Sequence, residues 1–90
     1  MNQELYTIKD TVTGVMNSPV TSINRGAILR DYGDIINSKE ALPVHLEKIR
    51  SNVKDLQLYK IGDYNVLTGE ITPCNEFICN LIDLKTTVGE

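Results

Sequence analysis

The hexapeptide LYTIKD at Leu5–Asp10 is echoed as LYKIGD at Leu58–Asp63, and each copy is followed within a few residues by Thr-Gly. Both copies are rich in the β-branched and aromatic residues that are typical of strands. Glycine readily adopts the positive φ that a hairpin turn needs, so Gly14 and Gly69 mark turns. The echo therefore predicts two β-hairpins of similar design.

Each predicted hairpin has a return strand. The first is expected over Val15–Thr21 and contains Pro19, which has no N–H group to donate to a β-ladder and so belongs on an edge or at a bulge. This strand is therefore expected at the margin of the sheet. The second hairpin is expected to run from Leu56–Tyr64 through a turn at Leu67–Gly69 into a return strand at Glu70–Pro73.

A helix is predicted after the first hairpin, with Asn24 as its N-cap and Asn37-Ser38 at its end. Its apolar residues fall within an arc of about 120° at a 3.6-residue period, which predicts one buried stripe. They are Ile28, Leu29, Tyr32, Ile35 and Ile36. Gly33 lies in the middle at a cost of up to ~1 kcal/mol relative to Ala, which a close backbone approach would explain.

Two further segments show helical spacing. Leu42, Leu46, Ile49 and Val53 repeat at i, i+4, i+7 and i+11, which favours a second helix. Near the C-terminus, Phe77, Ile78, Leu81 and Ile82 lie on one helical face, with Asn75 as a candidate cap. For this last segment a strand over Phe77–Leu84 is also compatible with the pattern.

Together these elements predict a single α+β domain over residues 1–90, in ββα-ββα order. About four strands are expected to form one antiparallel sheet, with the two hairpins side by side and the helices covering one face. The Ile-rich helix is expected to seal the apolar side of that sheet.

Composition narrows the class of protein. The chain has 41% hydrophobic and 23% charged residues, which is ordinary for a soluble globule, and its net charge of −3 argues against a surface that grips nucleic acid everywhere. The segment Asn24–Lys60 carries +2 and the flanks carry −5, so a local basic face is compatible with the sequence. No apolar run approaches the roughly 20 residues of a membrane span, so no membrane association is expected.

Cysteine and histidine usage predicts neither a disulfide nor a metal site. Cys74 and Cys79 are five residues apart, a spacing that separates the side chains on either a helix or a strand. With His45 as the single histidine, a four-ligand zinc site lacks partners. Reduced cysteines in a cytoplasmic setting, without cofactor, are the expectation.

The order of these motifs resembles the small non-structural protein of gokushoviruses, a Microviridae subfamily of single-stranded-DNA bacteriophages. The resemblance rests on LYTIKD, the Pro19 strand, RGAILRDYGDIIN at Arg25–Asn37 and LYKIGDYNVLTGEI at Leu58–Ile71. It implies a protein of the host bacterial cytoplasm that binds DNA or acts in single-stranded DNA synthesis. The chain departs from the family in the apparent extra helix over Leu42–Lys54 and in Ala27, where the family often has Glu in a capping box.

The candidate nucleic-acid-binding residues are Asn24, Arg25, Gly26, Arg30, Tyr59 and Lys60. Arg25 opposes the dipole of the helix that it begins, and with the free N–H groups there and Gly26 it could hold a phosphate. Alternatively, Arg25 lies over the apolar stripe and pairs with a nearby acid.

Tyrosines on the predicted strands give a second candidate surface. Tyr6, Tyr59 and Tyr64 could stack bases on an open sheet face, or they could pack in the core. Lys60 is adjacent to Tyr59 and so is expected on the opposite face unless a bulge intervenes.

No nucleophile, carboxylate pair, Gly-rich phosphate loop or metal cluster forms a motif, so the protein is not expected to be an enzyme. Two functions are compatible with the sequence. The first is binding of single-stranded DNA or of a phage or host replication protein during genome synthesis. The second is a protein interaction module that uses a sheet edge or helix face without contacting nucleic acid, and a homodimer joined through strands would serve either.

Overall fold

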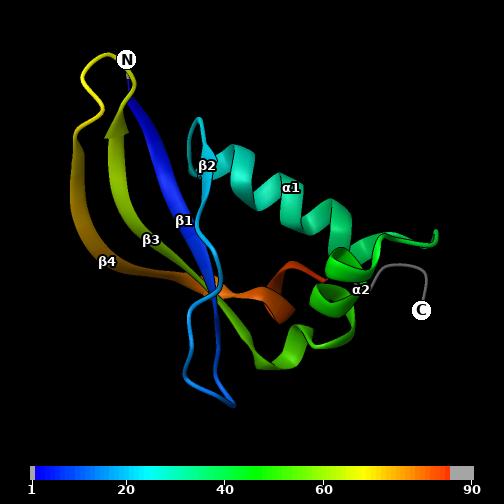
Figure 1. Ribbon diagram of the computed structural model, residues 1–90. Coiled ribbons are helices and arrows are strands. Elements are labelled where there is room, and N and C mark those ends of the chain that lie inside the picture. Colours follow the sequence, from blue (N-terminus) through cyan, green and yellow to red (C-terminus); the bar gives the residue numbers. More distant parts are fainter. Residues whose placement is uncertain (1, 86–90) are drawn as a thin grey trace.

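A computed structural model describes residues 2–85 of the chain as one four-stranded antiparallel sheet with helices packed on one side (Figure 1). The elements are β1 (Asn2–Asp10), β2 (Val20–Ser22), α1 (Arg25–Asn37), α2 (Val44–Ser51), the 3₁₀ turn η1 (Val53–Asp55), β3 (Leu56–Asn65), β4 (Ile71–Asn80) and the 3₁₀ turn η2 (Leu81–Leu84). The strand order is β2-β1-β3-β4. The predicted α+β class and the single antiparallel sheet are confirmed.

The two echoed hexapeptides lie side by side in the centre of the sheet. Strands β1 and β3 pair antiparallel along their whole length, with Ile8 opposite Leu58 and Thr7 opposite Tyr59. The two hairpins therefore share one layer, as expected, and β2 forms its margin. The repeat thus supplies the two central strands, whose outer neighbours are the shorter β2 and the strongly curved β4 (Figure 1).

Both hairpin turns are closed by the same set of hydrogen bonds. In the first, the Asp10 carboxylate accepts from Val12 N and Thr13 N, Gly14 N donates to Asp10 O, and Asp10 N donates to Val15 O. The second turn repeats this pattern from Asn65 to Glu70. Gly14 and Gly69 have φ of 77° and 80°, so the predicted use of glycine at both turns is confirmed.

Helix α1 seals the sheet through its apolar stripe. The Asn24 side chain accepts from Ala27 N at 2.8 Å, which confirms the predicted N-cap. Ile28, Tyr32 and Ile36 are buried, and they belong to one core with residues of both central strands. That core also contains Tyr6, Ile8, Val53, Leu56, Leu58 and Leu81.

Two expectations about the hairpins are corrected. The predicted return strand over Val15–Thr21 is reduced to β2 at Val20–Ser22 plus one bridge between Lys9 and Met16, because Pro19 cannot extend the ladder. The second return strand does not end at Pro73 but continues to Asn80.

The helix predicted over Phe77–Ile82 is therefore wrong, and the strand alternative holds as far as Asn80. The turn at Gly69 returns the chain alongside β3, which is ten residues long. The backbone groups on the free edge of β3 pair with this segment as far as Asn80, and this pairing favours a strand over a helix. After Asn80, η2 turns Leu81 into the core, where its side chain is fully buried.

The segment that departs from the resembled family forms a helix, as predicted. Within Leu42–Lys54, α2 occupies Val44–Ser51, and Arg50 ties it back by donating to Ser38 O at 2.6 Å. None of its residues is fully buried, and so α2 lies at the border of the core. Among residues 2–85, no helix is long and apolar enough to cross a membrane.

Candidate functional site

The open face of the sheet, on the side away from the helices, carries an aromatic pair at its centre. Tyr59 of β3 lies directly opposite Thr7 of β1 on one side and Phe77 of β4 on the other. The Tyr59 and Phe77 rings meet edge to face, with centroids 5.7 Å apart and planes at 72°. Lys9 Nζ lies 5.8 Å from the Tyr59 ring centroid, within the range of a cation–π contact.

Strand alternation places these residues together. Leu58 is fully buried against α1, so its neighbour Tyr59 must project from the other face. Residues opposite one another in antiparallel strands share a face, which brings Thr7 and Phe77 to the side of Tyr59. Phe77 remains 47% exposed, so its ring is available to a ligand.

Two irregularities in the β3–β4 ladder shape this face. The register shifts between Leu58 and Tyr59 and again between Lys60 and Gly62, and each bulge bends the strand that carries it. Glycine is favoured at Gly62, at the second shift, since a Cβ atom there would lie 2.9 Å from Thr72 O and the backbone would have to shift to admit it. The curvature of β4 in Figure 1 follows from these shifts.

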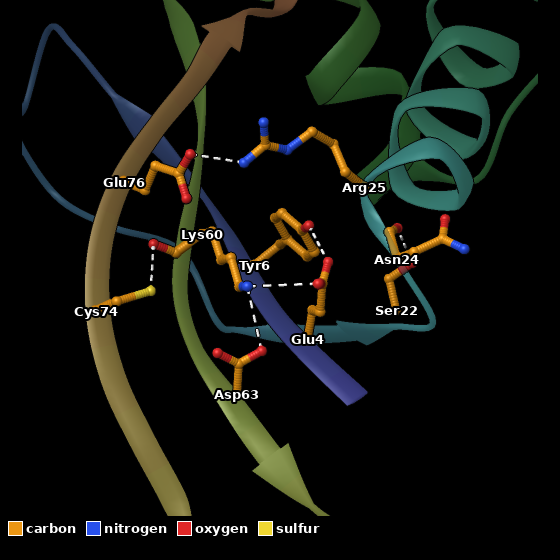
Figure 2. A network of polar contacts seen from close by, with 9 residues as sticks. All are labelled: Glu4, Tyr6, Ser22, Asn24, Arg25, Lys60, Asp63, Cys74 and Glu76. Carbon is orange, nitrogen blue, oxygen red and sulfur yellow. Dashed lines mark hydrogen bonds and ion pairs between the residues drawn. The ribbon is translucent and has the colours of Figure 1, made fainter. Parts of the chain in front are cut away.

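Charges are segregated between the two faces of the strands. In the register of the sheet, Glu4 is opposite Asp63 and Lys60 is opposite Glu76. All four side chains belong to the helix side, where Figure 2 shows them gathered around Tyr6. The Asp10 carboxylate is engaged in the first turn. Among the charged residues of the four described strands, Lys9 is therefore the one on the open face.

The helix-side charges form a polar network below the first turn of α1 (Figure 2). The Tyr6 hydroxyl donates to Glu4, whose other oxygen accepts from Lys60 Nζ at 3.4 Å. Lys60 also pairs with Asp63 at 3.2 Å, and Arg25 pairs with Glu76 at 2.6 Å. Each cation of this network is thus held by an acid.

The network shifts the protonation equilibria of Tyr6, Lys60 and Arg25, and for Arg25 the hydrogen bond to Glu76 raises the pKa of the guanidinium. Burial and the hydrogen bond to Glu4 raise the pKa of Tyr6 to about 12. The hydrogen bond to Asp63 raises the pKa of Lys60 above its usual value, with a further contribution from Glu4. Tyr6 is therefore a neutral donor and Lys60 a cation throughout the physiological range.

The predicted site residues are divided between the two faces. Asn24, Arg25 and Lys60 lie on the helix side, where Figure 2 shows them near one another, and Tyr59 lies on the open face. Arg25 pairs with an acid, Glu76, as the alternative interpretation expected. The binding of a phosphate by Arg25 stays a prediction. Gly26 lies in the first turn of α1 and Arg30 on its exposed side.

The tyrosines also separate. Tyr6 is fully buried on the helix side, so it cannot stack on a ligand, whereas Tyr59 and Tyr64 are half-buried. Lys60 lies opposite Tyr6 rather than beside Tyr59, as alternation predicted. The residues missed from the sequence are Lys9 and Phe77, and reading the tail as a strand paired with β3 would have indicated Phe77.

A second concave region lies between the β2 edge and the two helices. It is a groove of about 730 Å³, within the size range of ligand sites, and its lining is mainly apolar. Its polar residues include Asp31, His45 and Lys48. Among residues 2–85, no group of three or more His, Cys, Asp or Glu side chains is placed to hold a metal ion.

Comparison with protein families gives the biological setting. The family model described as Phage ORF5 protein matches residues 3–84, which is nearly the whole chain. The chain belongs to this phage protein family. The comparisons with curated proteins and with solved structures found no match.

Proposed function

We propose that this phage protein binds single-stranded DNA on the open face of its sheet and acts, without catalysis, in viral single-stranded DNA synthesis. Membership of the Phage ORF5 family supports the phage setting. The sequence resemblance supports a gokushovirus of the Microviridae as the source and the host bacterial cytoplasm as the place of action. The DNA could be bound alone or within the replication complex.

The observation that carries this proposal is the aromatic pair Tyr59–Phe77 beside Lys9, on a face whose strands present no acid. Stacking of a base on an aromatic side chain is worth about 1–3 kcal/mol and accepts every base. Lys9 supplies one positive charge for a phosphate. The net charge of −3 disfavours DNA binding over the whole surface, which supports a local site such as this face.

Fluorescence anisotropy with a labelled dT oligonucleotide at about 50 and 200 mM salt tests the proposal. We expect Phe77→Ala to weaken binding about fivefold or more, because one stacking surface is lost. Lys9→Gln should lower the magnitude of the salt slope by about 0.7, the value for one phosphate contact on a single strand.

Leu67→Ala provides the matched control for these variants. Leu67 is an exposed apolar residue, 82% accessible, but it lies at the tip of the second hairpin rather than on the open face. Affinity should be unchanged by this substitution. No binding at low salt, or equal loss in Phe77→Ala and Leu67→Ala, would contradict the proposal.

The groove favours a second candidate function, a module that engages a phage or host replication protein without touching DNA. It combines the edge residues Ser18 and Val20 with apolar residues of both helices, as in sites where an extended peptide adds to a sheet edge. Val20→Arg should then abolish co-purification with phage replication proteins while leaving the anisotropy titration unchanged. A homodimer joined through strands would instead appear as a concentration-dependent mass in sedimentation equilibrium.

A further inference from the structure

A row of polar side chains lies beside the aromatic pair on the open face. Gln57 of β3 is opposite Lys9 of β1 and Asn80 of β4, just as Tyr59 is opposite Thr7 and Phe77. Gln57 and Tyr59 are two residues apart on one strand and so project from the same face. An amide row therefore runs parallel to the aromatic row, one step along the strands.

Hydrogen bonds connect the two rows and orient the amides. The Tyr59 hydroxyl donates to Gln57 Oε1 at 3.4 Å, and Gln57 Nε2 donates to Asn80 Oδ1 at 3.0 Å. Both amide oxygens thus accept a bond from within the protein. What remains for a ligand are N–H groups of Asn80 Nδ2 and the second N–H of Gln57 Nε2.

We propose that this amide row reads the edge of a base that stacks on the aromatic pair, so that DNA binding is selective rather than uniform. The inference rests on the proposed function, because it concerns the same surface. A site that presents donors favours bases whose edges carry carbonyl oxygens, such as thymine, over adenine, whose exocyclic amino group is itself a donor.

The distance between the rows suits such a contact. Neighbouring positions on one strand face are separated by two residues, or about 7 Å, which is within reach of the polar edge of a base that lies over a ring. Asn80 is exposed, and so its amide is open to a ligand. Stacking then supplies affinity and the amide row supplies discrimination.

The test compares labelled dT and dA oligonucleotides of equal length with Asn80→Asp. This substitution keeps an oxygen that accepts from Gln57 but replaces the free amide N–H groups of Asn80 with an acceptor. The added negative charge weakens binding of both oligonucleotides alike, so the readout is the ratio of the two affinities. Because the free oligonucleotides are the same in every titration, differences in their own stacking cancel when variants are compared.

We expect the wild-type protein to prefer dT by about fivefold or more, and Asn80→Asp to lower this preference by about fivefold, the range of one base-edge contact. Asn75→Asp is the matched control, since it adds the same charge to β4 outside the amide row and should preserve the ratio.

The outcomes separate the two proposals. Binding that depends on Phe77 but shows the wild-type dT preference in Asn80→Asp, or no preference in the wild type, would overturn base reading and leave the proposed function intact. Absence of binding to both oligonucleotides would overturn both proposals.

Discussion

The two faces of the central strands differ in what they contribute, although one residue separates them along the chain. On the helix side, Tyr6 and Leu58 are completely buried, whereas the open side combines Phe77, which is 47% exposed, with the buried Thr7, whose hydroxyl donates to Asn17 O. The helix side gathers the acids and the open side carries Lys9. Alternate residues of β3 thus contribute to different surfaces, one packed against the helices and one facing away from them, and on the proposed function the second is the surface that binds DNA.

The largest difference between the two faces is expected when each of two adjacent residues of β3, Leu58 and Tyr59, is replaced by Ala. Leu58→Ala should lower the free energy of unfolding by about 3 kcal/mol, because it removes a fully buried side chain and leaves a cavity. Tyr59→Ala should cost less, about 1–2 kcal/mol, since this half-buried ring loses its edge-to-face contact with Phe77 and part of its buried area. Urea denaturation followed by circular dichroism measures both.

DNA affinity should show the reverse order. Titrated below its unfolding transition, Leu58→Ala should bind like the wild type, while Tyr59→Ala should bind about fivefold more weakly. If Tyr59→Ala were as unstable as Leu58→Ala, the open face would be part of the core and the division between faces would fail.

A second comparison concerns two glycines that the sequence alone does not distinguish. Gly62→Ala should destabilise the fold by about 1–3 kcal/mol, because its Cβ would lie 2.9 Å from the backbone oxygen of Thr72 at the β3–β4 bulge. Gly33→Ala should stabilise it by up to ~1 kcal/mol, since a Cβ on this helical residue meets nothing within 4 Å. Thermal unfolding of both variants gives the signs directly.

Equal effects of the two substitutions would mean that the bulge relaxes freely. In that case the curvature of β4, and with it the placement of Phe77 beside Tyr59, would not depend on Gly62. The expectation of a close backbone approach at Gly33 is wrong. Among residues 2–85, a Cβ atom at Gly33 would meet no neighbouring backbone within 4 Å.

The sequence predicted what local chemistry determines. Asp10 and Asn65 each precede Thr-Gly, and both turns form with the same bonds, as the Thr-Gly repeat suggested. The hexapeptide echo aligns Asp10 with Asp63, whereas the turns align Asp10 with Asn65, so the turn of the second hairpin begins two residues later relative to its hexapeptide. Bulge positions depend on pairing between distant strands, and no local pattern records them.

The candidate site was harder to predict for the same reason. Asn24 and Tyr59 could be placed from capping and alternation, but Phe77 joins Tyr59 through the register of β4. The tail has apolar residues at spacings that suit a helix or a strand, and pairing with the free edge of β3 decided between them. The acid partner of Arg25, Glu76, and one of the two acid partners of Lys60, Glu4, likewise come from strands that are far away in the sequence.

The smallest expected effects concern the pair Arg25–Glu76 on the helix side. The two side chains are about half exposed, at 50% and 51%, so Arg25→Gln should cost less than about 1 kcal/mol of stability. If DNA is confined to the open face, Arg25→Gln and Glu76→Gln should each change affinity less than twofold.

The phosphate hypothesis for Arg25 predicts a different pattern, because Glu76 at 2.6 Å competes with any phosphate for the guanidinium. Glu76→Gln would then strengthen DNA binding and Arg25→Gln would weaken it, with a lower salt slope in the latter. Glu70→Gln, at the second hairpin turn, removes the same charge outside the network and controls for a general electrostatic gain. A gain specific to Glu76→Gln would show that DNA contacts both sides of the sheet, and the separation between a structural face and a binding face would no longer hold.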